Sequence, residues 1–101
     1  MDSKYFNNNQ YLSSEKTLLD GCELKFTFPN GYTAIVRKDA GSEGGPYGLW
    51  ETSVMYNDRI VDDFYIIHTY LGWRYNPLGW QTYNDAKTFL EKIRELPEKV
   101  T

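Results

Sequence analysis

The chain of 101 residues is predicted to form a single α+β domain, in which a C-terminal helix covers an antiparallel sheet of three to four strands. Three observations predict this class. Apolar and polar residues alternate along several segments of the first half, turn residues separate those segments, and the last segment carries an apolar stripe at helical spacing. A chain of this length forms one modest core, so a second independent domain is excluded.

Residues 1–20 are predicted to be an N-terminal arm, and residues 21–101 the domain itself. The first dozen residues contain three consecutive Asn and no apolar period, which is typical of a poorly ordered tail. Several large apolar side chains do not fit a purely solvated tail: Tyr5, Phe6, Tyr11 and Leu12. The arm is therefore either flexible or docked on the domain or a partner, and residues 13–20 are long enough for a short helical turn.

Three segments carry the signature of strands. The clearest is Cys22–Phe28, where strict alternation places every second side chain on one face. Pro29–Gly31 follows, and its Asn-Gly pair favours a tight primed turn, so Tyr32–Lys38 is expected to return antiparallel. Leu49–Tyr56 alternates in the same way and forms the third strand. Four of the eight glycines lie in Asp39–Gly48, which predicts a long, mobile hairpin loop.

Residues 60–70 are ambiguous between a strand and a short helix. Their β-branched and aromatic content favours a strand, whereas a cap at Asp62 and a helically spaced set of side chains favour a helix: Phe64, Ile67, His68 and Leu71. We predict the helix.

The C-terminal helix is the clearest element of the second half. Thr82 and Asp85 have the spacing of a capping box, and Pro97 ends the helix. Its apolar stripe is expected to pack on the sheet and consists of Ala86, Phe89, Leu90, Ile93 and Leu96.

Composition and charge exclude several classes of function. A net charge of -3 and a pI near 5.0 provide no basic surface for a phosphate backbone, so duplex nucleic acid is not an expected partner. The single Cys22 cannot form an internal disulfide, and no segment has the pattern of a signal peptide or a membrane span. A cytoplasmic location without a membrane partner is the expectation. The sequence indicates no oligomeric state.

No motif predicts a cofactor, a metal site or an enzyme. A catalytic role for His68, the only histidine, requires Asp62 and Asp63 to meet it in a pocket, and a lone histidine in an apolar run more often has a packing role. Asp58, Asp62 and Asp63 form an acidic patch, but their spacing does not match a calcium loop. The glycine-rich segment Gly41–Gly48 lacks the ending of a nucleotide-binding loop.

The segment from residue 64 to residue 83 is unusually aromatic, with seven aromatic side chains in twenty residues. One face of a small core cannot absorb all of them, and Gly72, Pro77 and Gly79 interrupt any regular element. These side chains either pack under the helix or form an exposed binding surface, in which an arginine between two aromatic rings is typical of interface hot spots. The candidate binding residues are Tyr70, Trp73, Arg74, Tyr75 and Trp80.

Three segments, Phe28–Arg37, Gly45–Glu51 and Asp85–Leu96, occur in an order that resembles small accessory proteins of tailed bacteriophages. The resemblance covers roughly residues 22 to 97 and implies no assigned catalytic chemistry. Proteins of this kind that have known roles are often non-enzymatic inhibitors of host defence systems, including anti-CRISPR proteins. The resemblance therefore implies an inhibitor of this type. The aromatic segment Phe64–Trp80 departs from the plainer pattern, and no functional residue is transferred from the family.

Two functions of different classes follow. The first is a phage-type protein that binds a host protein, such as a defence nuclease or its complex, through the aromatic surface and blocks it sterically, with the acidic patch as a second candidate surface. The alternative is a binder of nucleotides or single-stranded nucleic acid, in which Arg74 contacts a phosphate while three rings stack on bases: Trp73, Tyr75 and Trp80. The aromatic surplus supports the first, and net acidity opposes the polynucleotide form of the second.

Overall fold

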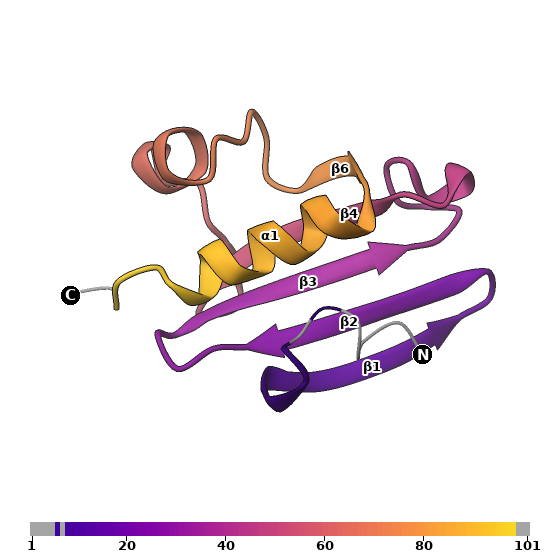
Figure 1. The fold of residues 1–101 in the computed structure, drawn as a ribbon, viewed down its shortest axis with the longest axis horizontal. Coiled ribbons are helices and arrows are strands. Elements are labelled where there is room, and N and C mark those ends of the chain that lie inside the picture. Colours follow the sequence, from indigo (N-terminus) through magenta and orange to yellow (C-terminus); the bar gives the residue numbers. More distant parts are fainter. Residues whose placement is uncertain (1–5, 7, 99–101) are drawn as a thin grey trace.

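The structure is a computed structural model that describes residues 6 and 8–98 of the chain. It confirms the α+β class: an antiparallel sheet packs against one long helix (Figure 1). The sheet has six strands instead of the expected three to four, in the order β1-β2-β3-β4-β5 with β6 also paired to β4. The elements are β1 (Leu12–Leu18), β2 (Gly21–Thr27), β3 (Tyr32–Lys38), β4 (Trp50–Tyr56), β5 (Arg59–Ile60), β6 (Leu78–Gln81), α1 (Tyr83–Arg94) and the short helices η2 (Asn9–Tyr11), η3 (Gly45–Tyr47) and η4 (Tyr65–Tyr70).

The three predicted strands are the central β2, β3 and β4, and they pair in sequence order. Leu24 lies opposite Val36, and Ala34 lies opposite Val54, so alternate side chains of all three strands point to the same face. These side chains are buried, and α1 lies across them (Figure 1). The side chains of the opposite face are half-buried, for example at Ile35.

The β2–β3 hairpin forms where it was predicted, but its turn is not the primed type. Within this fully described turn, Gly31 alone has a positive φ (92°), and its N–H donates to the carbonyl of Phe28 at 3.1 Å. This hydrogen bond places Pro29 and Asn30 at the centre of the turn, and neither has a positive φ. A primed turn needs a left-handed residue at its first central position, so that prediction was wrong at this turn. The type I′ geometry instead occurs between β4 and β5, where Asn57 (φ 52°) and Asp58 (φ 61°) are both left-handed.

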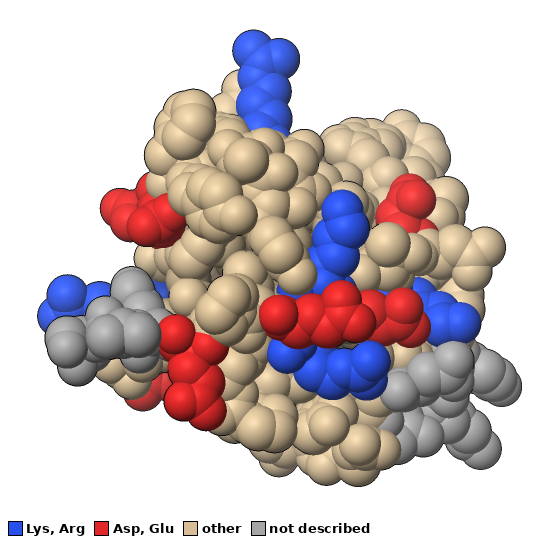
Figure 2. All heavy atoms as spheres, turned by 60° about the vertical axis from the view of Figure 1, so that its left-hand side comes forward, with Lys and Arg blue, Asp and Glu red and all other residues tan. Residues whose placement is uncertain are grey.

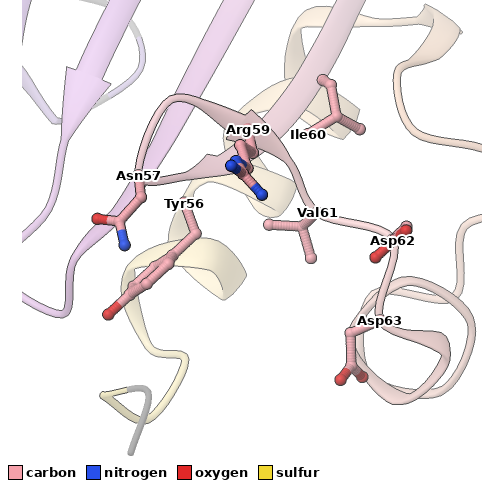
Figure 3. Close-up of a pocket in the computed structure, with 7 residues that line it drawn as sticks. All are labelled: Tyr56, Asn57, Arg59, Ile60, Val61, Asp62 and Asp63. Atoms are coloured by element: carbon pink, nitrogen blue, oxygen red, sulfur yellow. The ribbon is translucent and has the colours of Figure 1, made fainter. Parts of the chain in front are cut away.

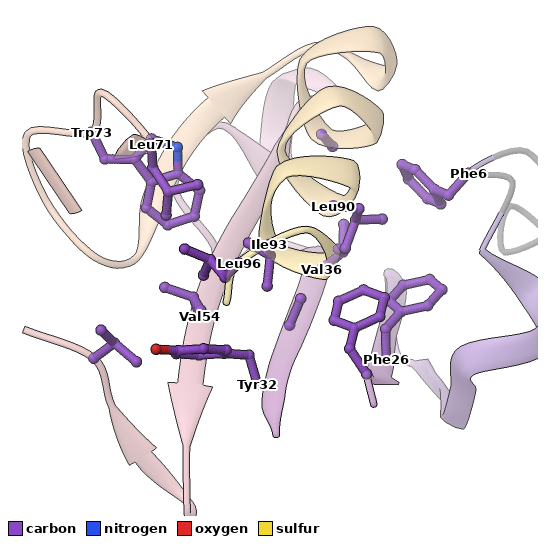
Figure 4. Close-up of a cluster of buried hydrophobic side chains, with 14 of the residues drawn as sticks. Phe6, Phe26, Tyr32, Val36, Val54, Leu71, Trp73, Leu90, Ile93 and Leu96 are labelled. Carbon is purple, nitrogen blue, oxygen red and sulfur yellow. The ribbon is translucent and has the colours of Figure 1, made fainter. Parts of the chain in front are cut away.

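Helix α1 begins and packs as predicted. The side chain of Thr82 accepts from the N–H of Asp85, and the side chain of Asp85 accepts from the N–H of Thr82, which completes the capping box. Most of the predicted stripe is buried, whereas Phe89 is partly buried against the core. Figure 4 shows Leu90 and Ile93 in the middle of the core, with Trp73 and Phe6 at its opposite ends.

The end of α1 is joined to the first hairpin turn by Asn30. Its amide nitrogen Nδ2 lies 2.8 to 3.0 Å from three carbonyls at the helix end, and its Oδ1 accepts from the N–H of Tyr32 at 3.0 Å. The carbonyls belong to Ile93, Arg94 and Leu96. The last carbonyls of a helix have no intrahelical hydrogen-bond donor. Here the buried side chain of Asn30, 63 residues before Ile93 in the sequence, supplies the donor.

The N-terminal segment is docked where the structure describes it, and the helical turn predicted for residues 13–20 was wrong. Residues 12–18 form β1, which pairs with β2 along its length. Phe6 is fully buried, with its ring centroid 5.2 Å from that of Trp50. Asn8 is buried beside it and accepts from the Arg94 guanidinium at 3.0 Å. The rest of the predicted arm and the last residues of the predicted domain, 1–5, 7 and 99–101, lie outside the described residues.

The glycine-rich loop is held by hydrogen bonds to buried side chains, an arrangement that does not support the predicted mobility. Asp39 and Ser42 are buried, and the N–H of Asp39 donates to the Ser42 hydroxyl at 3.0 Å. The carboxylate of Asp39 accepts from Arg37 at 3.0 Å and from the N–H of Gly41 at 2.7 Å. Burial alone raises the pKa of Asp39, but these hydrogen bonds and the positive charge of Arg37 hold that pKa below its usual value. The start of the loop is therefore held by the buried Asp39 carboxylate, which is hydrogen-bonded to Arg37 and Gly41.

Candidate interaction surface

The structure divides the predicted aromatic site. Trp73 is only 1% exposed and packs edge-on against Phe89 at 5.2 Å between ring centroids, so it belongs to the core and its predicted exposure was wrong. Tyr70 is half-buried against the same core. Burial, followed by the charge of Glu95 and the proximity of Tyr65, raises the pKa of the Tyr70 hydroxyl.

The remaining predicted residues are exposed but lie in two different places. Tyr75 (64% exposed) and Arg74 project from the segment between η4 and β6, and the Arg74 guanidinium lies 5.7 Å from the centre of the Tyr75 ring. Trp80, 58% exposed, lies on β6 against the glycine-rich loop, with its ring 5.6 Å from that of Tyr47.

Exposed side chains of β5 and η4 extend the surface around Tyr75. Phe64 is 72% exposed, and its ring contacts that of His68 at 4.7 Å. His68, Arg74, Tyr75 and Ile60 line one small hollow, so these side chains are contiguous. We call this set the aromatic surface; it consists of Ile60, Phe64, His68, Arg74 and Tyr75, with exposed Tyr65 beside it.

Helix η4 is wound as a π-helix, and Phe64, directly before it, is exposed. The predicted helix forms over the second half of residues 60–70, as η4, whereas Ile60 belongs to β5. The N–H of Leu71 donates to the carbonyl of Ile66, five residues back, at 2.9 Å, which is the hydrogen-bond pattern of a π-helix. The wider turn changes which side chains face the core: Ile66 and Ile67 are buried, whereas Phe64 and His68 of the predicted stripe are exposed. The N–H of Ile66 is capped by the Asp63 carboxylate at 3.1 Å, and not by Asp62 as predicted.

Main-chain contacts hold the segment that carries Arg74 and Tyr75. The Nδ1 atom of His68 lies 2.9 Å from the carbonyl of Trp73, and the N–H of Trp73 donates to the carbonyl of Ile67 at 2.7 Å. Because a carbonyl only accepts, Nδ1 of His68 carries the proton in this contact. On the other side of Tyr75, the side chain of Asn76 is hydrogen-bonded to β4. The exposed side chains therefore extend from an anchored backbone.

A hollow of about 590 Å³ lies beside the aromatic surface, under the β4–β5 hairpin (Figure 3). Its lining includes Asp62 and Asp63 of the predicted acidic patch, whereas Asp58 lies in the hairpin turn outside the lining. The other lining residues are Tyr56, Asn57, Arg59, Ile60 and Val61. The buried Tyr32 packs against Tyr56 at 5.1 Å, and burial, then the charge of Asp63, raises the pKa of its hydroxyl.

A second hollow of about 160 Å³ is lined by both Asp62 and His68, whereas Asp63, which the predicted catalytic grouping also requires, does not line it. Among the described residues that line it there is no Ser, Thr or Cys to act as a nucleophile. Its volume is also below the several hundred Å³ that is typical of small-molecule sites. No three His, Cys, Asp or Glu side chains in the described part of the chain are grouped so that they could hold a metal ion.

Charge is mixed over the surface. Figure 2 shows acidic and basic side chains interleaved in a band across one face, with a mostly uncharged surface above it on which a few charged side chains are scattered. Arg59 and Arg74 are the basic side chains that line the two hollows, and the carboxylates of Asp62 and Asp63 lie among them. Such a mixture does not form a track for a nucleic-acid backbone.

Three exposed aromatic residues were not among the predicted site residues: Tyr47, Phe64 and Tyr65. Phe64 belongs to the helically spaced set that predicted the helix, and no local pattern signals the π-helical turn that follows it. Tyr47 lies in the glycine-rich segment, which was interpreted as a mobile loop. Its contact with Trp80 depends on the pairing of β6 with β4, which joins segments about thirty residues apart.

No family model matches the chain, and no match was found among curated proteins or among solved structures. In the part of the chain that the structure describes, no helix combines the length and the apolar character needed to span a bilayer.

Proposed function

We propose that the chain is a non-enzymatic binding protein that attaches to a larger protein through the aromatic surface and blocks it sterically. The observation that carries the proposal is the contiguous set of exposed Phe, Tyr, Ile and Arg side chains beside a hollow of about 590 Å³. Aromatic residues and arginine are enriched at the centres of protein interfaces, where they contribute most of the binding energy.

The anchored backbone supports this proposal. A surface that keeps its shape before binding loses less conformational entropy on association. Here His68 and Asn76 fix the main chain on either side of Arg74 and Tyr75, so those two side chains are positioned in advance.

The resemblance to small tailed-phage proteins makes a cytoplasmic host protein, such as a defence nuclease or its complex, the first partner to test. Asp62 and Asp63 at the edge of the surface favour a partner that presents basic side chains next to an apolar patch. Acidic side chains at a rim contribute mainly to the rate and orientation of association.

A site-specific cross-link tests the proposal. Phe64 replaced by the photoreactive p-benzoylphenylalanine is expected to attach to one bacterial protein, whereas the same replacement at Leu19, an exposed residue on the β1–β2 turn, is not. With that partner purified, Phe64→Ala and Tyr75→Ala are each expected to lose about 2 kcal/mol of binding free energy, and Leu19→Ala none.

The same variants distinguish the alternative. If folded Phe64→Ala and Tyr75→Ala proteins bind the partner as the parent does, the aromatic surface is not the interface. Titration with a ten-nucleotide oligo(dT) and with nucleotides tests whether the exposed rings stack on bases. Saturable binding that is lost in Tyr75→Ala would favour nucleotide or single-stranded nucleic-acid binding over protein binding. Burial of Trp73 already removes one of the three rings that nucleic-acid stacking was expected to use.

A further inference from the structure

A second exposed aromatic site lies away from the aromatic surface, at the contact between β6 and the glycine-rich loop. The rings of Tyr47 and Trp80 are tilted by 31° with 5.6 Å between their centroids, and Tyr47 is 77% exposed. Trp80 has a left-handed backbone (φ 59°), which is an outlier for a bulky side chain. Burial does not account for this conformation, because the ring that it positions remains largely in solvent.

The backbone around this ring pair is tightly held. The N–H of Trp80 donates to the carbonyl of Glu43 at 3.2 Å, and the N–H of Leu49 donates to the carbonyl of Gly44 at 3.0 Å. Gly79 passes directly under Glu43: a Cβ atom at position 79 would lie 2.2 Å from the Cβ of Glu43. This close approach requires glycine and fixes Glu43 next to Trp80.

The charge beside the rings is negative. The same Cβ position on Gly79 would lie 2.9 Å from the Oε2 atom of Glu43, so this carboxylate lies over the residue adjacent to Trp80. Glu51 is close as well, since its Oε2 accepts from the N–H of Glu43 at 3.1 Å. Within the described residues, no Lys or Arg forms an ion pair with Glu43.

We propose that Tyr47, Trp80 and Glu43 form a recognition site for a cationic side chain, an ammonium or guanidinium group presented by a protein or peptide. The face of an aromatic ring carries negative potential, and tryptophan is the strongest cation–π partner. The Glu43 carboxylate, which lies over the adjacent Gly79, adds a negative charge close to Trp80. An anionic ligand such as a nucleotide phosphate would meet the Glu43 carboxylate here, so this charge favours a cation.

The site is tested on the full-length protein by following the Trp80 indole N–H signal in NMR spectra. The probes are three capped tripeptides, acetyl-Gly-X-Gly-amide, in which X is arginine, trimethyllysine or the neutral norleucine. Because Trp50 and Trp73 are buried, the Trp80 signal is expected to respond most directly to the probes. A saturable shift with either cationic peptide and none with norleucine is expected, and the stronger of the two identifies the preferred cation.

Glu43→Gln keeps the packing over Gly79 and removes the charge, so it is expected to weaken binding of the cationic peptide by about two- to fivefold. Tyr47→Ala is expected to weaken it by a similar factor, whereas Tyr75→Ala on the aromatic surface leaves it unchanged. An equal response to norleucine, no saturable shift with either cation, or an unchanged affinity in folded Glu43→Gln protein overturns the proposal. These outcomes are independent of the aromatic surface and its partner.

Discussion

The side-chain amide of Asn76 pairs with the main chain of Val54 as a residue of a neighbouring strand would. Its Oδ1 accepts from the N–H of Val54 at 3.1 Å, and its Nδ2 donates to the carbonyl of Val54 at 2.9 Å and to that of Val61 at 2.8 Å. β5 covers one end of β4 and β6 covers the other, so Asn76 continues the hydrogen bonding between them. The N–H of Val61 also donates to the carbonyl of Val54 at 3.1 Å, so Asn76 and Val61 together provide the hydrogen bonds at this part of the sheet edge.

Replacing Asn76 with Asp is expected to lower the free energy of unfolding by about 2 kcal/mol or more. The substitution keeps the shape but removes the donor for two carbonyls and places a negative charge beside them. Urea denaturation measures the loss. The matched control is Asn84→Asp on the exposed first turn of α1, which is expected to change stability by about 0.5 kcal/mol or less. Equal effects at the two positions would contradict the role of Asn76.

Trp73 and Tyr75 are expected to behave in opposite ways although they are two residues apart. Trp73→Ala removes a buried ring that packs on Phe89 and is expected to cost about 3–5 kcal/mol of stability. Tyr75→Ala is expected to cost about 0.5 kcal/mol or less, because its ring is exposed. Thermal melts of both variants decide this. A Tyr75→Ala protein that melts as early as Trp73→Ala would place Tyr75 in the core.

A glycine at position 80 is expected to be more stable than an alanine by about 1 kcal/mol. Both variants lose the indole, but only glycine adopts the left-handed φ of 59° without a Cβ penalty. Chemical denaturation of the pair isolates the backbone term, since the ring is absent from both. The order would reverse if the backbone at position 80 were not left-handed in solution.

Amides of the glycine-rich loop are expected to exchange slowly with solvent. The N–H groups of Tyr47, Gly48 and Leu49 donate to loop carbonyls at 2.8 to 3.0 Å, so exchange requires local opening. We expect these amides to exchange at least about 100-fold more slowly than in an unstructured peptide. The amide of Leu19, an exposed residue on the β1–β2 turn, serves as the internal reference for fast exchange. Exchange as fast as in a free peptide across residues 45–49 would indicate that the loop is not docked.

Asp39 is expected to stabilise the fold at neutral pH and to lose this effect in acid. Its pKa in the folded protein is below the usual 3.8, so the unfolded chain binds its proton first as the pH falls. The contribution is complete above pH 3.8 and declines as the pH falls toward the lower, folded-state pKa. At pH 6 we expect Asp39→Asn to be less stable than the parent by about 2 kcal/mol.

Denaturation of both proteins between pH 6 and pH 2 measures this effect. The difference in stability between the parent and Asp39→Asn is expected to decrease below pH 3.8, because Asp39 becomes protonated there. The other carboxylates titrate in both proteins, so their effects cancel in this difference. A difference that stays constant down to pH 2 would mean that the ionised form of Asp39 is not the stabilising species.

Local sequence determined the elements whose signals depend only on neighbouring residues. Alternation over residues 22–28, 32–38 and 49–56 predicted the three central strands, and the capping box with its apolar stripe predicted α1, because side-chain period and cap chemistry operate within a few residues. The α+β class follows from those elements alone. The aromatic surplus also indicated correctly that some rings between residues 64 and 83 lie on the surface.

Tertiary structure decided the features that depend on distant partners. β1 has a weak pattern of its own and becomes a strand by pairing with β2, while β5 and β6 are short segments aligned along β4. Trp73 and Tyr75 lie on the same irregular segment, and their separation into core and surface depends on where α1 and β4 lie. The contact of Tyr47 with Trp80 likewise requires the glycine-rich loop to meet β6. Burial and side-chain pairing are properties of the assembled fold, so local periodicity does not encode them.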